Sequence, residues 1–425
     1  MAAEEGNLIA CQHGQAALAA RLLKRVSASR TSSNLIFSPL SIHVALALMS
    51  AGAAEDTLDE ILSIAGAPSR DDLEAFVKGV VVDRVLADRS GIGGPSVAFA
   101  CGSWTDKTLP LKSTYRDTVV GTYKGETWAV DFRNHPVESR REINAWVAKA
   151  TRNLITEVLD PYSPSETLHV VANAIYFKAE WRSIFDKDDT VDEEFHLLDG
   201  STVDDVPFMR RPWRFYQRIA CHDGFRVLQL PYKSCEDDSS GYFSYKLREN
   251  LPEFSMCVFL PEEHDGLWGL VDKLTSRPEF LREHLPTRHV PVGKFRLPKF
   301  KLTYMASIRG VLKGVGLRLP FDRLLANMTE IVGDEESGAM QLCVDEVVHK
   351  AVVEMNEEGS EAAAVTVESD DDMGFSLYDD YDVPKPEPEP TVDFVADHPF
   401  AFFIIEETSG TVVFAGHVLD PTKEE

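Results

Sequence analysis

The sequence lacks the features by which proteins usually bind nucleic acid or membranes. Its 425 residues carry a formal net charge of −26, and no cluster of lysine and arginine stands out. Nucleic acid and anionic membrane surfaces both attract basic surfaces, so they are poor partners for this chain. No apolar run approaches the length needed to span a bilayer. We therefore expect no nucleic-acid partner and no membrane partner.

Cysteine pairs with metal-ligand spacing are also absent. The six cysteines are scattered singly, mostly inside apolar patterns, at Cys11, Cys101, Cys221, Cys235, Cys257 and Cys343. This distribution is typical of buried free thiols in a reducing compartment. Residues 1–6 are acidic and are not followed by the uninterrupted hydrophobic segment of a secretory signal. These observations predict a cytoplasmic or otherwise intracellular protein.

The motifs of the large enzyme classes are missing. The sequence contains no G-x-S-x-G, no H-E-x-x-H, no Walker loop and no kinase signature. Acidic residues cluster between Asp370 and Asp382, but their spacing lacks the glycine and the terminal glutamate of an EF-hand. A solvated run of charge explains them better than a calcium site. We therefore predict no enzyme activity, no metal site and no cofactor.

Helix patterns dominate the first third of the chain and strand patterns dominate the remainder. Helices are expected at 8–26, 39–52, 69–80, 137–151, 266–274 and 307–314, and strands at 34–37, 97–104, 127–132, 167–177, 195–198, 203–208, 213–221, 225–230, 255–260, 292–304, 347–355, 400–405 and 412–418. Asp-Gly pairs at 199–200 and 223–224 predict two hairpins. Because no βαβ rhythm repeats, the fold class is α+β with mixed or antiparallel sheets. A single domain over 1–425 is the simplest organisation.

One long stretch, residues 357–393, does not read as packed core. It lies between a strand pattern that ends at Met355 and the apolar run 400–405. It begins with EEGSEAAA, turns acidic at 368–372, and alternates proline with glutamate at 386–390. A structureless segment of this length inside a compact chain is either functional or disordered.

A series of motifs, in the right order, resembles those of the serpin family. They are residues 34–42 (NLIFSPLSI), 173–181 (NAIYFKAEW), 297–300 (LPKF), 349–352 (HKAV), 357–364 (EEGSEAAA) and 394–400 (FVADHPF), the last of which is similar to plant serpins. The resemblance spans about residues 8–421. It implies a serpin fold with three mixed or antiparallel sheets, about eight or nine helices, and an exposed reactive-centre loop at about 357–393.

The resemblance implies a suicide inhibitor of a serine protease, with a cysteine protease as an alternative target. A protease cuts the exposed loop, and the cut loop inserts into the large sheet as a new strand before the acyl-enzyme is hydrolysed. The loop hinge would be Glu357, Gly359, Ser360, Glu361, Ala362, Ala363 and Ala364. The polar cluster that gates the sheet would be Ser38, Ser41, Asn173 and His349. By the same analogy we expect a monomer. The resemblance also admits the extracellular space as an alternative location.

The family pattern places the cut fourteen residues after the hinge glycine, at Met373-Gly374. A methionine before the cut suits a chymotrypsin-like or elastase-like protease and does not suit trypsin. Rival positions are Asp372, Phe375, Leu377 and Tyr378. Cleavage after Asp372 would indicate a protease that selects acidic residues.

Two carboxylates depart from the pattern of an inserted strand. Alternate residues counted from Ser360 would face the core, and these include Glu368 and Asp370. Burying one carboxyl group at pH 7 costs roughly 4 kcal/mol, so two cost at most about 8 kcal/mol. A new strand gains roughly ten net hydrogen bonds of about 1 kcal/mol each. We therefore predict an inhibitor of reduced efficiency; the alternative is a non-inhibitory serpin that serves as a binding or storage protein.

Overall fold

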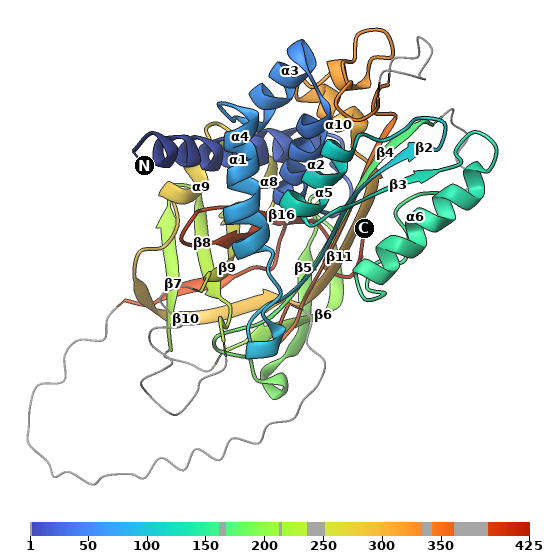
Figure 1. Cartoon of the computed structure of the whole chain (residues 1–425). Coiled ribbons are helices and arrows are strands. Elements are labelled where there is room, and N and C mark those ends of the chain that lie inside the picture. Colours follow the sequence, from blue (N-terminus) through green and yellow to red (C-terminus); the bar gives the residue numbers. More distant parts are fainter. Residues whose placement is uncertain (1, 161–166, 212–214, 236–250, 334–341, 361–389) are drawn as a thin grey trace, which may run out of the picture.

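The computed structural model describes residues 2–160, 167–211, 215–235, 251–333, 342–360 and 390–425. The helices in these ranges are α1 (Ala2–Ser27), α2 (Pro39–Gly52), α3 (Glu55–Ala65), α4 (Arg70–Phe76), α5 (Ser113–Tyr123), α6 (Pro136–Ala150), α8 (Leu267–Leu274), α9 (Phe280–Glu283) and α10 (Arg309–Gly314). A π-helical segment, Val77–Val85, continues α4. Figure 1 shows most helices gathered at one end of the molecule, whereas α6 lies across the outer face of a sheet.

A six-stranded mixed sheet has the strand order β11-β12-β13-β4-β2-β3. Its strands are β2 (Ser96–Asp106), β3 (Glu126–Val130), β4 (His169–Glu180), β11 (Phe300–Ser307), β12 (Glu346–Met355) and β13 (Gly359–Ser360). β12 also pairs directly with β4, in parallel, from Glu346 opposite Val170 to Val352 opposite Tyr176. This β12–β4 boundary, which we call the seam, runs down the middle of the sheet.

A ten-stranded sheet has the order β1-β16-β15-β9-β8-β7-β10-β6-β5, with β14 beside β10. Its strands are β1 (Leu35–Phe37), β5 (Val191–His196), β6 (Thr202–Arg210), β7 (Phe215–His222), β8 (Phe225–Pro231), β9 (Phe254–Pro261), β10 (His289–Pro298), β14 (Val392–Val395), β15 (Phe400–Glu406) and β16 (Val412–Val418). β10 pairs with β7 near its start and with β6 near its end. The described residues therefore form two hydrogen-bonded sheets, and the expectation of three is corrected because β10 joins two of them.

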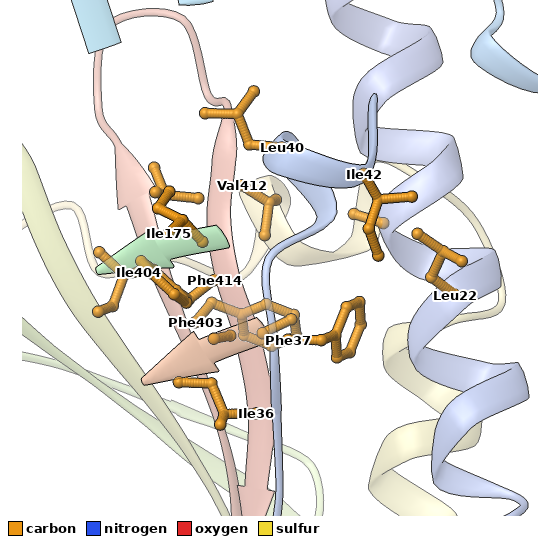
Figure 2. Packing of buried hydrophobic residues seen from close by; sticks show 14 of the residues in the cluster. Leu22, Ile36, Phe37, Leu40, Ile42, Ile175, Phe403, Ile404, Val412 and Phe414 are labelled. Carbon is orange, nitrogen blue, oxygen red and sulfur yellow. The ribbon is translucent and has the colours of Figure 1, made fainter. Parts of the chain in front are cut away.

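The larger hydrophobic core fills the space between the sheets and the helices. Helix α2 is buried on every side, as an apolar helix inside a core should be. Figure 2 shows Leu22 of α1, Phe37 of β1 and Ile42 of α2 in this core, together with Phe403 of β15 and Phe414 of β16. A smaller core lies between α6 and the outer face of the six-stranded sheet. β4 is thus buried on both faces.

Most of the predicted elements are confirmed, including both hairpins, whose turn glycines Gly200 and Gly224 have φ of +83° and +82°. The prediction of a single strand over 292–304 was wrong. It is divided into β10 and β11, which belong to different sheets, because Pro298 has no N–H for the ladder and Lys299 donates its N–H to Pro207 instead. Helices α3, α5 and α9 were not predicted, and α1 begins at Ala2 rather than at Leu8.

All six cysteines lie in the described ranges and none of them forms a disulfide. Four are buried, as the sequence predicts, whereas Cys221 is exposed and Cys235 is half-buried. Within the described ranges, every helix is too short or too polar to cross a membrane.

Candidate functional site

The seam opens as a wedge at one end. The parallel pairing of β12 with β4 stops at Val352 and Tyr176. Beyond that point β13 lies between the two strands and is antiparallel to both, with Ser360 paired to Met355 on one side and to Ala179 on the other. The first residues of the expected loop therefore already occupy the opening of the sheet.

Glu357 anchors the chain as it enters the wedge. Its side chain is only 4% exposed and accepts hydrogen bonds from Thr190 Oγ1 at 2.8 Å and from Lys299 Nζ at 3.0 Å. Burial alone would raise the pKa of Glu357, but its own backbone N–H, Thr190 and Lys299 outweigh burial and hold that pKa below its usual value. The carbonyl of Glu357 also accepts the Phe185 N–H at 2.8 Å. The carboxylate is thus bound in its ionised form.

An aromatic pair holds the next residues. The Trp181 and Tyr232 rings stack with centroids 4.5 Å apart, and the Trp181 Nε1–H donates to the Asn356 carbonyl at 2.9 Å. The Tyr232 hydroxyl lies 2.7 Å from Ser360 Oγ, which is fully buried. At Gly359, φ is +157° and an added Cβ would lie 2.0 Å from the Ala179 carbonyl oxygen. Only glycine fits this approach between two strands.

The four residues of the expected gate lie together beneath the seam. Asn173 of β4 and His349 of β12 are directly opposite each other in the parallel register, and Ser38 and Ser41 come from the start of α2. All four side chains are fully buried. The cluster therefore spans the two strands that an inserting segment would have to separate.

The hydrogen bonds of this cluster fix the tautomer of His349. Its Nε2 accepts the Ser38 backbone N–H at 3.0 Å, so Nδ1 carries the proton and donates to Asn173 Oδ1 at 2.8 Å. Asn173 Nδ2 in turn donates to the Ser41 carbonyl at 2.9 Å. Burial lowers the pKa of His349 to about 3, which keeps the ring neutral near pH 7.

We expect Asn173→Ala to lower the free energy of unfolding by about 2–4 kcal/mol, because it removes the buried hydrogen bonds of Asn173 with His349 Nδ1–H and the Ser41 carbonyl and leaves a cavity under the seam. Urea unfolding followed by circular dichroism measures the change. The control is Asn134→Ala at an exposed asparagine, which removes one solvent-exposed hydrogen bond to Asp131, so the expected change is below about 1 kcal/mol. Equal stability of the two variants would contradict the assignment.

The structure corrects one expectation about the loop. Glu357, Gly359 and Ser360 were expected to begin an exposed segment, but Glu357 is bonded to Lys299 and Ser360 is paired on both sides. The remaining hinge residues, Glu361, Ala362, Ala363 and Ala364, lie outside the described residues, as do Glu368, Asp370, Asp372, Met373, Gly374 and Phe375.

The sequence analysis did not identify the residues that hold the hinge. Trp181 and Lys299 stand inside motifs that it had singled out, but nothing in a linear pattern shows that they contact residues near 357. Tyr232 follows a strand pattern and carried no separate signal. Their role depends on the register of β13, which is a property of the folded sheet.

Comparisons with known proteins agree with these features. A family model described as "Serpin (serine protease inhibitor)" matches residues 13–421. Putative serpin-Z5 of Oryza sativa subsp. japonica is 49% identical over 96% of this chain and 90% of its own length, and serpin-ZX of Hordeum vulgare is 43% identical over 96% of each. The solved structure of Arabidopsis AtSerpin1 in its native stressed conformation aligns with a TM-score of 0.83 and 38% identity, covering 98% of this chain and 99% of that one.

Proposed function

Because the chain belongs to the serpin family, we propose that it inhibits a serine protease by suicide-substrate trapping. The nucleophile of the protease attacks the carbonyl carbon before the scissile bond, which we place at Met373-Gly374. An acyl bond forms, the peptide C–N bond breaks, and the new amine leaves with a proton. Insertion of the cut loop into the seam then distorts the attached protease before water can hydrolyse the acyl bond.

The observation that carries this proposal is the wedge at the seam. Ser360 is already paired with both flanking strands, whereas β12 and β4 still pair with each other from Glu346 and Val170 onwards. A segment that follows Ser360 can enter only by replacing that parallel pairing with two antiparallel ladders. The number of backbone hydrogen bonds then rises, and insertion is favourable.

The register of β13 predicts what each inserted side chain would meet. Continued by twos from Ser360, it places Thr366 opposite both Asn173 and His349. A hydroxyl group at that position can hydrogen-bond to the gate cluster instead of being buried without a partner. The segment is therefore compatible with the polar floor of the seam.

The same register separates the two carboxylates by environment. Glu368 would lie opposite Val171 and Val347, both of which are fully buried and apolar. Asp370 would lie opposite His169, whose buried Nδ1 has no hydrogen-bond partner among the described residues, and on its other side opposite Asp345, whose carboxylate repels it. Burial lowers the pKa of His169 to about 4, so its ring is neutral near pH 7 and offers Asp370 at most a hydrogen bond. Both carboxylates therefore contribute to the cost of insertion. We expect this cost to weaken inhibition without abolishing it.

The test is to mix the protein with chymotrypsin, elastase and trypsin and to measure the SDS-stable complex on gels. We expect a complex with chymotrypsin or elastase, no complex with trypsin, and a larger complexed fraction from the double variant Glu368→Ala/Asp370→Ala. Each single variant, Glu368→Ala or Asp370→Ala, should gain less than the double variant. Mass spectrometry of the released peptide identifies the bond that is cut.

Two outcomes would change the interpretation. If wild type and the double variant form equal fractions of SDS-stable complex, burial of the two carboxylates does not limit inhibition. Cleavage of the loop without any stable complex, in wild type and variant alike, would reject trapping and would favour a non-inhibitory role in binding or storage. A protease whose active-site serine is blocked is the control for non-covalent association.

A further inference from the structure

Three histidines and an aspartate from separate parts of the chain meet near the ends of strands β5, β9 and β15 of the ten-stranded sheet. His196 ends β5, His264 lies in the turn between β9 and α8, and Asp397 and His398 connect β14 to β15. The His264 ring stacks on His196 and on His398, with centroid separations of 4.4 and 4.7 Å. The backbone N–H of His196 also donates to the backbone carbonyl of Asp397 at 2.8 Å, which holds β5 against the β14–β15 connection.

The hydrogen bonds of His398 are those of a metal-binding histidine. Its ring is buried, and Nε2 lies 2.8 Å from the Pro261 carbonyl oxygen, which can only accept, so Nε2 carries a proton. The other nitrogen, Nδ1, lies 2.8 Å from Asp397 Oδ1, which is also an acceptor. A proton between Nδ1 and the carboxylate satisfies both atoms, and a cation that stands to one side of the pair, about 2 Å from each atom, can replace that proton. Metal-bound histidines usually donate their other ring N–H to a carbonyl or carboxylate in this way.

The surroundings of His264 are strongly acidic. A surface hollow beside it is lined by Asp199, Glu262, Glu263 and Asp265, with no lysine or arginine among its lining residues. All four carboxylates are exposed. They create a negative potential that concentrates cations at the mouth of the cluster.

We propose that His264, Asp397 and His398 bind one Zn²⁺ ion. Two imidazole nitrogens and one carboxylate oxygen are ligands that Zn²⁺ prefers, and water would complete an open coordination sphere. The three ligand atoms lie within 4.8 Å of one another. A cation at their centre is no more than about 2.8 Å from any of them, and rotation of the exposed His264 ring shortens this to the roughly 2.0–2.2 Å of zinc bonds.

His196 would act as a positioning residue, because it stacks on His264 without offering a ligand atom within that group. A bound ion would tie the β14–β15 connection to the turn before α8. The sequence analysis predicted no metal site, since residues 264 and 397–398 are far apart in the chain and no local motif joins them. Only the packing of β9 beside β15 brings them together.

The first test is Zn²⁺ binding to the intact protein, measured by competition with a chromophoric chelator in the presence of a phosphine reductant. We expect one equivalent of Zn²⁺, and a Kd that rises at least tenfold in His264→Ala. Two controls should stay within twofold of wild type: His289→Ala, an exposed histidine of β10, and Cys221→Ala, an exposed thiol. Wild-type affinity in His264→Ala, or loss of binding in Cys221→Ala, would overturn the proposal.

A second measurement does not depend on the buried ligand. Co²⁺ in place of Zn²⁺ should give visible d–d absorption bands in wild type that disappear in His264→Ala and in the near-isosteric Asp397→Asn. Zn²⁺ should also raise the Tm of wild type by a few degrees and leave the Tm of His264→Ala unchanged, because a ligand stabilises only the state that binds it. An equal Tm shift in both proteins would show that Zn²⁺ binds elsewhere.

Discussion

Cleavage of the loop is expected to raise the Tm of the protein by several degrees. Insertion of the cut segment behind Ser360 would replace the parallel β12–β4 pairing with two antiparallel ladders. Roughly ten additional hydrogen bonds, at about 1 kcal/mol each, would stabilise the cleaved protein by about 10 kcal/mol, and burial of Glu368 and Asp370 would offset at most about 8 kcal/mol of this gain. In a chain of this size, 1 kcal/mol corresponds to a shift in Tm of roughly 1–2 °C.

Circular dichroism melts of intact and nicked samples measure this shift. Thr366→Arg is the test variant, because residue 366 would be inserted against Asn173 and His349, where a guanidinium group cannot be buried without cost. The nicked form of that variant should gain much less heat resistance. Val383→Arg, on the other side of the proposed cut, is the matched control and should gain as much as wild type. If nicked wild type has the same Tm as the uncut protein, the cut segment does not insert into the seam.

Mild acid is expected to destabilise the protein by several kcal/mol. His43, His169 and His417 are buried with pKa values lowered to about 4, and burial lowers the pKa of His349 to about 3. In the unfolded chain each would titrate near 6.5. Because the folded pKa is the lower one, the stability is present above pH 6.5 and is lost as the pH falls toward 4. At pH 5 each of these histidines lowers the free energy of unfolding by about 2 kcal/mol, and the four together lower it by at most about 8 kcal/mol.

Urea unfolding at pH 7 and at pH 5 measures this loss. His43→Gln keeps a donor that can reach the Ala65 carbonyl but removes the titrating ring. Between pH 7 and pH 5 this variant should therefore lose about 2 kcal/mol less stability than wild type. His289→Gln replaces an exposed histidine and should behave as wild type. Acid also reduces the net negative charge, but equally in all three proteins. The same loss in wild type and His43→Gln would contradict the argument.

The gate cluster shows what the sequence could and could not predict. Resemblance to a family named Ser38, Ser41, Asn173 and His349 from positions far apart in the chain, and the structure places all four in contact. Spacing alone could not have joined them, because their meeting depends on the parallel register of β12 and β4. Whether they control the opening of the sheet stays a prediction.

Other differences have local physical causes. Helix α3 carries signals that the sequence analysis passed over: acidic Glu55 and Asp56 in its first turn, and Gly66 in a left-handed conformation at its end. Helix α5 is harder to recognise, because Thr118, Val119 and Val120 favour strand. The anchored hinge was not predictable, since Glu357 is stabilised by Thr190 and Lys299, which join it only after both sheets have formed.

The seating of Ser360 has a consequence for the kinetics of insertion. Forming the first turn of a new ladder is ordinarily the slow, entropically costly step, because two distant segments must be brought into register before any bond is gained. For the insertion that we propose, this nucleus exists before cleavage, because Ser360 is held by Tyr232 and is paired on both sides. Growth can then proceed like a zipper, one residue at a time and from one end only. The barrier to each step is the parting of the next β12–β4 pair, beginning with Val352 and Tyr176.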